Sequence, residues 1–290
     1  MKRVAIQGGL GAYHEIAARD YFRGEELEIV PCHTFRDIFM EADRDPALIG
    51  VMAIENTIAG SLLSNHDLLK QHSLQIAGEY KLRITHTLSA LPGTTISELR
   101  EVMSHPMALM QCEAFLDGLP GVKLVEHDDT ALAAREIRER ELPATATICS
   151  SLAAEMYGLE ILASGIETNK RNFTRFFILA RGEMLREVQQ LNHINKSSLV
   201  FVLPHNQGSL SKVLSVLSFY GINLTRIQSL PIIGREWEYQ FYIDLTFDDY
   251  QRYRQSLDAI TPLISKLKVL GEYREEQNAG EKESQKNHSI

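Results

Sequence analysis

The hydrophobic positions of the first 181 residues form short segments that alternate between two periods. Segments 2–6, 48–54 and 145–149 are typical of buried strands, and segments such as 13–21 and 35–42 carry apolar residues at helical spacing. Strands that alternate with helices across short loops predict parallel sheets with helices on both faces. The segment 74–91 has an extended pattern, so we expect it to cross between two lobes, where ligand sites are common.

Polar residues mark the starts of several predicted helices. Thr34 precedes the helix 35–42, the run Asp128-Asp129-Thr130 precedes a helix that ends near residue 139, and Ser150-Ser151 precedes the next. Pro106 suits the first turn of a helix that follows the strand 101–104. These residues place the helix starts directly after predicted strands.

The remaining third of the chain has a different order of elements. Residues 182–196 are polar and read as a linker with room for a short helix, and residues 197–273 predict the order βαββαβ of a ferredoxin-like unit. The tail 274–290 is charged and nearly without apolar residues, so we expect it to be disordered.

Composition narrows the class of protein. A net charge of −8 disfavours a general binder of nucleic acid or of anionic membranes. Cys32, Cys112 and Cys149 are scattered, which fits reduced thiols better than disulfides or a zinc site. We find neither a signal peptide nor an apolar run of ~20 residues and therefore expect a cytoplasmic protein. The glycine turn 8–11 invites a dinucleotide site, but His14 occupies the place of the third glycine, so we reject it.

Two polar segments adjoin predicted buried strands. Glu55, Asn56 and Thr57 follow the strand 48–54, and the segment 169–176 (NKRNFTRF) leads into the strand 177–180. Open α/β sheets bind anionic ligands at such strand ends. The alternatives to a binding site are that residues 55–57 form a polar turn before a helix and that residues 169–176 form a charged loop before a strand.

Several motifs, taken in order, resemble the prephenate dehydratase family with a C-terminal ACT regulatory domain. The catalytic motifs are GGLGAYHE near the start, AIENTIAG at 53–60, SHPMALMQC at 104–112, DTALAA at 129–134, and ICSSLAAEMYGLEIL followed by NFTRF at 172–176; HNQGSLSKVL at 205–214 and GINLTRIQSLP resemble the ACT part. The resemblance implies an α/β fold, with a two-lobed, periplasmic-binding-protein-like catalytic domain at 1–181 and a second lobe at about 76–165. The linker 182–196, a ferredoxin-like ACT domain at 197–273 and the tail 274–290 would follow.

The resemblance also implies the conversion of prephenate to phenylpyruvate, CO2 and water, without a metal or an organic cofactor. It implies catalytic roles for Thr174, Glu55 and Asn56, and we expect Thr174 to face the leaving hydroxyl across a cleft from the other two. Substrate-binding roles fall to a second group: Thr57, Ser104, Gln111, Arg175 and Phe176. Thr57 stands where the family usually has serine, and Met107 stands where it usually has glutamine. His105 fits a helix cap better than a catalytic acid.

For the C-terminal part, the resemblance implies feedback regulation by phenylalanine at an interface between paired domains, in a homodimer or homotetramer. The regulatory residues would be Asn206, Gly208, Ser209 and Leu210. The family's Glu-Ser-Arg-Pro is replaced here by QSLP at 228–231, which puts the strength of regulation in question. The alternatives are an arogenate dehydratase or, in another class, a non-catalytic amino-acid sensor or solute-binding protein.

Overall fold

The protein is described here by a computed structural model that covers residues 1–189, 194–204, 206–232, 234–235 and 238–276. Most of the tail that we expect to be disordered, residues 277–290, lies outside the described residues. The chain divides into two compact units, one of residues 1–62 and 80–176, the other of residues 63–79 and those from 177 onward.

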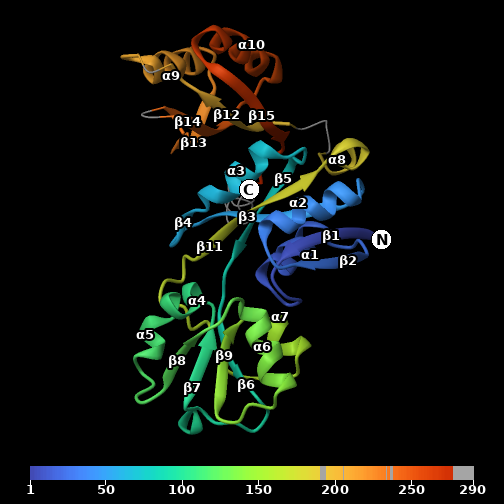
Figure 1. Cartoon of the computed structure of the whole chain (residues 1–290), viewed down its shortest axis with the longest axis vertical. Coiled ribbons are helices and arrows are strands. Elements are labelled where there is room, and N and C mark those ends of the chain that lie inside the picture. Colours follow the sequence, from blue (N-terminus) through green and yellow to red (C-terminus); the bar gives the residue numbers. More distant parts are fainter. Residues whose placement is uncertain (190–193, 205, 233, 236–237, 277–290) are drawn as a thin grey trace, which may run out of the picture. The chain divides into compact units, whose positions relative to one another are not determined.

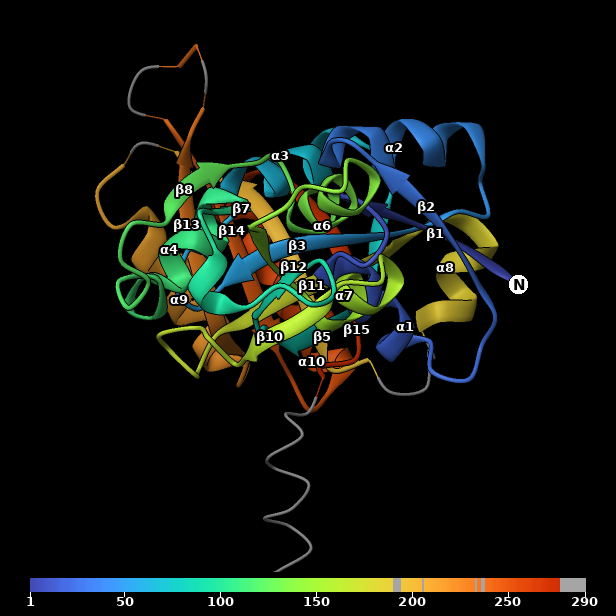
Figure 2. The same ribbon diagram turned by 90° about the horizontal axis from the view of Figure 1, so that it is seen from below.

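The first sheet has the strand order β2-β1-β3-β11-β5 (Figure 1). Its strands are β1 Lys2–Gln7, β2 Leu27–Cys32, β3 Ile49–Asn56, β5 Gln75–Arg83 and β11 Phe173–Ala180, with the short β4 Gly60–Ser61 beside β3. β1 pairs in parallel with both β2 and β3. The chain passes from β1 through α1 Tyr13–Tyr21 to β2 on one side of β1, and then through α2 Phe35–Arg44 to β3 on the other side. Because these two connections run in opposite directions across the sheet, α1 and α2 lie on opposite faces of these strands (Figure 2). Thr34 caps α2 as predicted.

The second sheet has the order β10-β6-β9-β7-β8 and forms a second lobe in the first unit. Its elements are β6 Thr87–Ala90, β7 Glu101–Ser104, α4 Pro106–Gln111, α5 Glu113–Leu116, β8 Lys123–Glu126, α6 Thr130–Glu139, β9 Thr145–Cys149, α7 Ser151–Met156 and β10 Glu160–Ser164. β7 is parallel to β8 and β9, but β6 is antiparallel to β9 and β10. The prediction of parallel sheets therefore holds for the pairs of β1 with β2 and β3 and of β7 with β8 and β9, and it is wrong for β6 and β10. β6 carries the chain into this lobe and β10 carries it out, with no helical crossover that would make them parallel to their neighbours.

Segments 84–86 and 165–172 connect the two sheets. Two α/β lobes joined by two crossing segments are the architecture that the term periplasmic-binding-protein-like denotes, so the predicted fold class is confirmed.

The glycine turn at 8–11 brings the two lobes into contact. A Cβ on Gly11 would lie 2.6 Å from the Cα of Ala153 in α7, and one on Gly9 would lie 2.6 Å from a methyl of Leu132 in α6. Ser150 Oγ donates a 2.6 Å hydrogen bond to the Gly11 carbonyl while it caps α7. The glycines thus allow two helix starts to approach this backbone closely.

The second unit contains the predicted βαββαβ order, with strands arranged β13-β14-β12-β15. Its elements are β12 Lys196–Val202, α9 Ser209–Phe219, β13 Asn223–Pro231, β14 Tyr239–Thr246, α10 Tyr250–Ile260 and β15 Ser265–Tyr273. Apolar residues of β12, β14, α9 and α10 form one core. The same unit holds α3 Leu63–Gln71 and, in the predicted linker, α8 Gly182–Gln189. No helix in the described ranges is both long and apolar enough to cross a membrane.

A buried ion pair lies where β5 meets β12 in this unit. Lys196 Nζ is 2.8 Å from Glu79 Oε1, and their side chains are only 4% and 0% exposed. Lys268 Nζ donates to the carbonyl of Lys70 in the last turn of α3 at 2.6 Å, and to that of His72, just past the end of the helix, at 3.0 Å. A cation at the C-terminal end of a helix satisfies carbonyl groups that the helix leaves unbonded.

Candidate active site

The polar segment after β3 and the polar segment before β11 meet in the first unit. The Thr57 amide donates to the Phe173 carbonyl at 2.9 Å. Thr57 Oγ1 donates to the Arg171 carbonyl at 2.9 Å and accepts from the Phe173 amide at 3.0 Å. Two segments more than 110 residues apart in the sequence are therefore held side by side.

Asn56 has a side-chain amide whose orientation is fixed by the backbone. Its Oδ1 accepts the amide hydrogens of Ile58 and Ala59, each at 2.9 Å. Its Nδ2 consequently faces β11, where it donates to Thr174 Oγ1 at 2.9 Å and to Asn172 Oδ1 at 2.8 Å. We expected Asn56 and Thr174 on opposite sides of a cleft. This expectation is wrong, because their side chains are in direct hydrogen-bond contact.

This contact determines what the Thr174 hydroxyl can do. Because Asn56 Nδ2 is a donor, Thr174 Oγ1 acts as the acceptor in their bond. Within the described residues Asn56 is the hydrogen-bond partner of this hydroxyl, so its own hydrogen is available to a third group. Thr174 is 9% exposed. The arrangement offers one oriented hydroxyl donor at a largely buried position.

The hydrogen bonds continue from Asn172 through side chains of both lobes. Asn172 Nδ2 donates to Gln111 Oε1 at 2.8 Å, and the same oxygen lies 2.9 Å from His86 Nε2. His86 Nδ1 lies 2.7 Å from the Tyr13 hydroxyl. Burial lowers the pKa of His86, which favours the neutral ring. We call Tyr13, His86, Gln111, Asn172, Asn56 and Thr174 the polar chain.

The polar chain contains three residues that are absent from the predicted site. Asn172 belongs to the NFTRF motif, so its position next to Thr174 was a usable signal. Tyr13 was assigned to the apolar face of a helix, and His86 is a single histidine in an extended segment. The local sequence of these two residues carries no sign of a contact across 73 positions.

Arg175 pairs with Glu55 across the two neighbouring segments. Arg175 Nη1 is 3.9 Å from Glu55 Oε2, and the side chains are 10% and 39% exposed. The resemblance assigned Arg175 to substrate binding, and the geometry gives it an ion pair with Glu55. A carboxylate beside a nearly buried guanidinium offsets the cost of removing that cation from water.

Other predicted substrate-binding residues do not join this group. Ser104 is 0% exposed, and its hydroxyl donates to the Ile148 carbonyl at 2.6 Å. Phe176 is 1% exposed and meets the His14 ring edge-on, with 5.0 Å between centroids. Both residues lie on strands whose positions are almost all buried, so neither strand has an exposed face toward which these side chains could point. His105 caps α4, with Nδ1 accepting from the Met107 amide at 3.2 Å, as expected.

The four predicted regulatory residues lie together in the second unit. Asn206, Gly208, Ser209 and Leu210 line a pocket of about 240 Å³, and its other lining residues are Leu203, Pro204, Ser211, Tyr239 and Phe241. Gly208 has a φ of 76° at the start of α9, a left-handed conformation that favours glycine.

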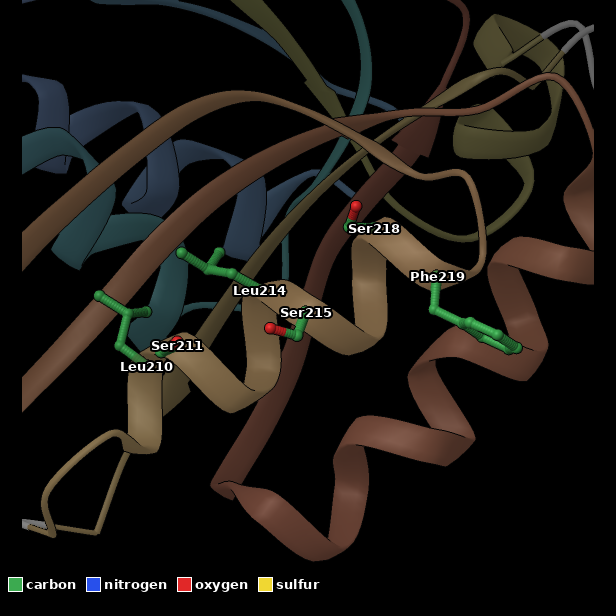
Figure 3. A pocket seen from close by; sticks show the side chains of 6 residues that line it. All are labelled: Leu210, Ser211, Leu214, Ser215, Ser218 and Phe219. Carbon is green, nitrogen blue, oxygen red and sulfur yellow. The ribbon is translucent and has the colours of Figure 1, made fainter.

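A wider, open hollow of about 820 Å³ runs along the outer side of α9 (Figure 3). Its lining residues are Leu210, Ser211, Leu214, Ser215, Ser218 and Phe219. Phe219 is 80% exposed. Leu210 therefore borders both the small pocket and the open hollow.

Comparison with known proteins identifies the family. The model described as PDT: Prephenate dehydratase matches residues 4–184, more than half of the chain. The Arabidopsis thaliana protein Arogenate dehydratase/prephenate dehydratase 2, chloroplastic, is 38% identical over 281 residues, which are 93% of this chain and 72% of that protein.

Two solved structures share the fold over almost the whole chain. One, described as GqqA, a novel type of quorum quenching acylase, is 31% identical with a TM-score of 0.83, covering 95% of this chain and 98% of its own. The other, prephenate dehydratase in complex with L-Phe from Arthrobacter aurescens, is 26% identical with a TM-score of 0.82, covering 94% and 89%. With the family match and the plant relative, the chain belongs to the prephenate dehydratase family of lyases.

Proposed function

We propose that this protein converts prephenate to phenylpyruvate, CO2 and water. The observation that supports the proposal most directly is the backbone-locked amide of Asn56. It makes Thr174 Oγ1 an acceptor and leaves the hydroxyl hydrogen for the substrate. The reaction requires such a donor because its difficult step is the departure of hydroxide near neutral pH.

In this reaction the bond from the ring to its carboxylate breaks, and CO2 leaves. The electron pair moves into the ring, the carbon–oxygen bond on the opposite side breaks, and the ring becomes aromatic. Hydroxide takes up a proton and leaves as water. A threonine is a weak acid, so we expect Thr174 to act through a strong hydrogen bond to the departing oxygen. One such donor contributes about 2.7–4 kcal/mol in comparable sites.

Arogenate is the second candidate substrate, because the plant relative carries both activities in its name. It differs from prephenate by an ammonium in place of the side-chain ketone, while the ring chemistry is the same. The polar chain therefore suits both substrates. The ratio of kcat/KM for prephenate and arogenate decides between them.

Acyl hydrolysis, the activity named for the GqqA relative, receives less support from this geometry. A hydroxyl nucleophile needs a neighbouring base that removes its proton. The partner of Thr174 is the amide NH2 of Asn56, which is a donor and cannot accept that proton. A non-catalytic solute-binding role leaves the orientation of Thr174 unexplained.

The test is turnover of prephenate by wild type and by Thr174→Val, which keeps the shape and removes the hydroxyl. We expect kcat to fall about 10²–10³-fold, with a smaller change in KM. Thr147→Val is the matched control, since Thr147 Oγ1 is buried without a hydrogen-bond partner in the described structure. Near-normal kcat in a folded Thr174→Val protein would remove Thr174 from the mechanism.

We further propose that residues 197–273 are an ACT domain that binds L-phenylalanine. The support is the 240 Å³ pocket at Gly208 and Leu210, together with the L-Phe complex of the Arthrobacter relative. Leu210→Glu should abolish phenylalanine binding in calorimetry, because it introduces a carboxylate into the pocket. Leu214→Glu makes the same change one helical turn away, outside this pocket, and should bind normally. Unchanged binding by Leu210→Glu would contradict the assignment.

A further inference from the structure

The polar chain has a fixed hydrogen-bond direction at its Asn56 end. Asn56 Oδ1 is occupied by two backbone amides, so its Nδ2 must donate to Asn172 Oδ1. Asn172 Nδ2 must then face Gln111 and donate to its Oε1. Gln111 Oε1 is an acceptor, and therefore the bond that it shares with His86 requires a hydrogen on His86 Nε2.

The other end of the polar chain can supply the matching partner. A neutral ring with hydrogen on Nε2 has a lone pair on Nδ1, which needs a donor in this buried position. The Tyr13 hydroxyl lies 2.7 Å from Nδ1 and 3.0 Å from the Thr85 carbonyl. It has one hydrogen to donate, and Nδ1 is the nearer acceptor. Burial raises the pKa of Tyr13, so this hydrogen is retained at neutral pH.

The opposite tautomer of His86 cannot be accommodated without losing a bond. With hydrogen on Nδ1, the ring would present a lone pair to Gln111 Oε1. Turning the Gln111 amide would set its NH2 against that of Asn172, and turning Asn172 would set its NH2 against Asn56 Nδ2. Asn56 cannot turn, because two backbone amides hold its oxygen. One contact between like groups therefore remains wherever the mismatch is moved.

We propose that Tyr13 and His86 are positioning residues that hold Gln111 and Asn172 in the orientation that Asn56 requires to direct the Thr174 hydroxyl. Asn56 sets the direction of these bonds and thereby the Nε2–H tautomer of His86, and the Tyr13 hydroxyl supplies the donor that the Nδ1 lone pair of this tautomer needs. These residues come from α1, from both crossing segments, and from α4 of the second lobe. The polar chain thus links the donor at Thr174 to both lobes of the first unit.

Nitrogen NMR of the full protein labelled with ¹⁵N-histidine tests the tautomer directly. We expect the His86 ring to show a protonated Nε2 and a hydrogen-bonded, unprotonated Nδ1 near pH 7. Its signals are identified by their absence in His86→Gln and, should that variant not fold, by their movement in Tyr13→Phe. A ring protonated on Nδ1 alone would overturn the inference.

The kinetic consequence rests on the proposed function and is measured with Tyr13→Phe, which removes one oxygen atom. We expect kcat for prephenate to fall about tenfold to a hundredfold, with KM changed far less. Tyr157→Phe is the matched control: its hydroxyl donates to the Leu10 carbonyl at 3.0 Å, beside the same lobe contact but outside the polar chain. Its kcat should stay within about twofold of wild type.

The outcomes separate the two proposals. Tyr13→Phe with wild-type kcat and an unchanged His86 Nδ1 signal would overturn the positioning role. Wild-type protein without prephenate turnover, but with an Nε2–H tautomer whose Nδ1 signal shifts in Tyr13→Phe, would defeat the proposed substrate and support the positioning role. Equal losses of kcat in Tyr13→Phe and Tyr157→Phe would mean that both hydroxyls act only by holding the lobes together, and this would overturn the inference.

Discussion

Asn56→Asp tests the orientation of the Thr174 hydroxyl with a change of almost no volume. The substitution keeps Oδ1 and its two backbone amide donors but replaces Nδ2 by a carboxylate oxygen. That oxygen would face Asn172 Oδ1 and Thr174 Oγ1 at the present distances of 2.8 and 2.9 Å. The donor at the centre of the site thus becomes an acceptor.

The two contacts respond differently. Thr174 can rotate its hydrogen onto the new carboxylate, which restores a hydrogen bond but removes the donor from the substrate. Asn172 can turn its NH2 toward the new carboxylate only if Gln111 also turns and His86 moves its hydrogen to Nδ1, which reverses the polar chain. The substitution in either case places a carboxylate at a position that is only 9% exposed, so we expect a loss of about 1–3 kcal/mol in unfolding free energy. The kcat should fall about 10²–10³-fold, as for removal of the donor itself.

Steady-state turnover of prephenate and denaturant unfolding measure the two effects. Asn223→Asp is the matched control, because Asn223 Nδ2 also donates to a threonine, Thr246 Oγ1 at 3.2 Å, on the exposed strand β13. It should change stability by no more than about 0.5 kcal/mol and leave kcat unaltered. A loss confined to KM in Asn56→Asp would refute the reasoning, since it would make Asn56 a substrate ligand that does not orient Thr174.

Three further changes test the packing and the electrostatics. Gly11→Ala should destabilise the fold by about 1–3 kcal/mol more than Gly24→Ala in denaturant unfolding, because both have a φ near 90° but only the first Cβ meets a neighbour; equal losses would contradict the lobe contact. Lys196→Met should cost about 3–5 kcal/mol, and adding Glu79→Gln should recover part of it; additive losses would show that the pair is not coupled. Burial lowers the pKa of His14 to about 3, so below the ordinary pKa of about 6.5 the unfolded ring takes up a proton while the folded ring does not. The unfolding free energy should therefore fall as the pH is lowered from about 6.5 to about 3. An equally steep fall in His14→Asn would argue against this origin.

Capping residues and hydrophobic periodicity located most helices and strands, because these signals depend on neighbouring residues in the sequence. Thr34 caps its helix as expected, Asp129 and Ser150 are the capping residues within the predicted runs 128–130 and 150–151, and β7 and β9 have the predicted bounds. Helix α3 was anticipated only in the alternative of a polar turn before a helix and its bounds were not predicted, since it buries polar residues: His66 is 2% exposed and contacts Arg226 of β13. Such a helix lacks an apolar face, and its burial follows from tertiary pairing that the segment itself does not encode.

The site shows the same division between local and distant information. Strand-end reasoning marked the segments 55–57 and 169–176 separately as candidate sites, but the direct contact of Asn56 with Thr174 was not predicted. The resemblance added Ser104, which ends β7 but directs its hydroxyl to the backbone of β9. Whether a residue at a strand end faces the site or the core depends on the neighbouring strand. The contact of Tyr13 with His86 depends on how the lobes meet, and no local pattern predicts it.

The arrangement around Thr174 explains how a weak acid can serve as the donor. Hydrogen bonds polarise one another, so a group that accepts donates more strongly. Asn56 accepts two backbone hydrogen bonds, which strengthens the bonds that its NH2 donates to Asn172 and Thr174. In the proposed reaction Thr174, having accepted one of these, would donate its own hydrogen more strongly to a developing hydroxide. Such preorganised dipoles need no reorganisation during the reaction, which suits a step whose barrier lies in the charge of the leaving group.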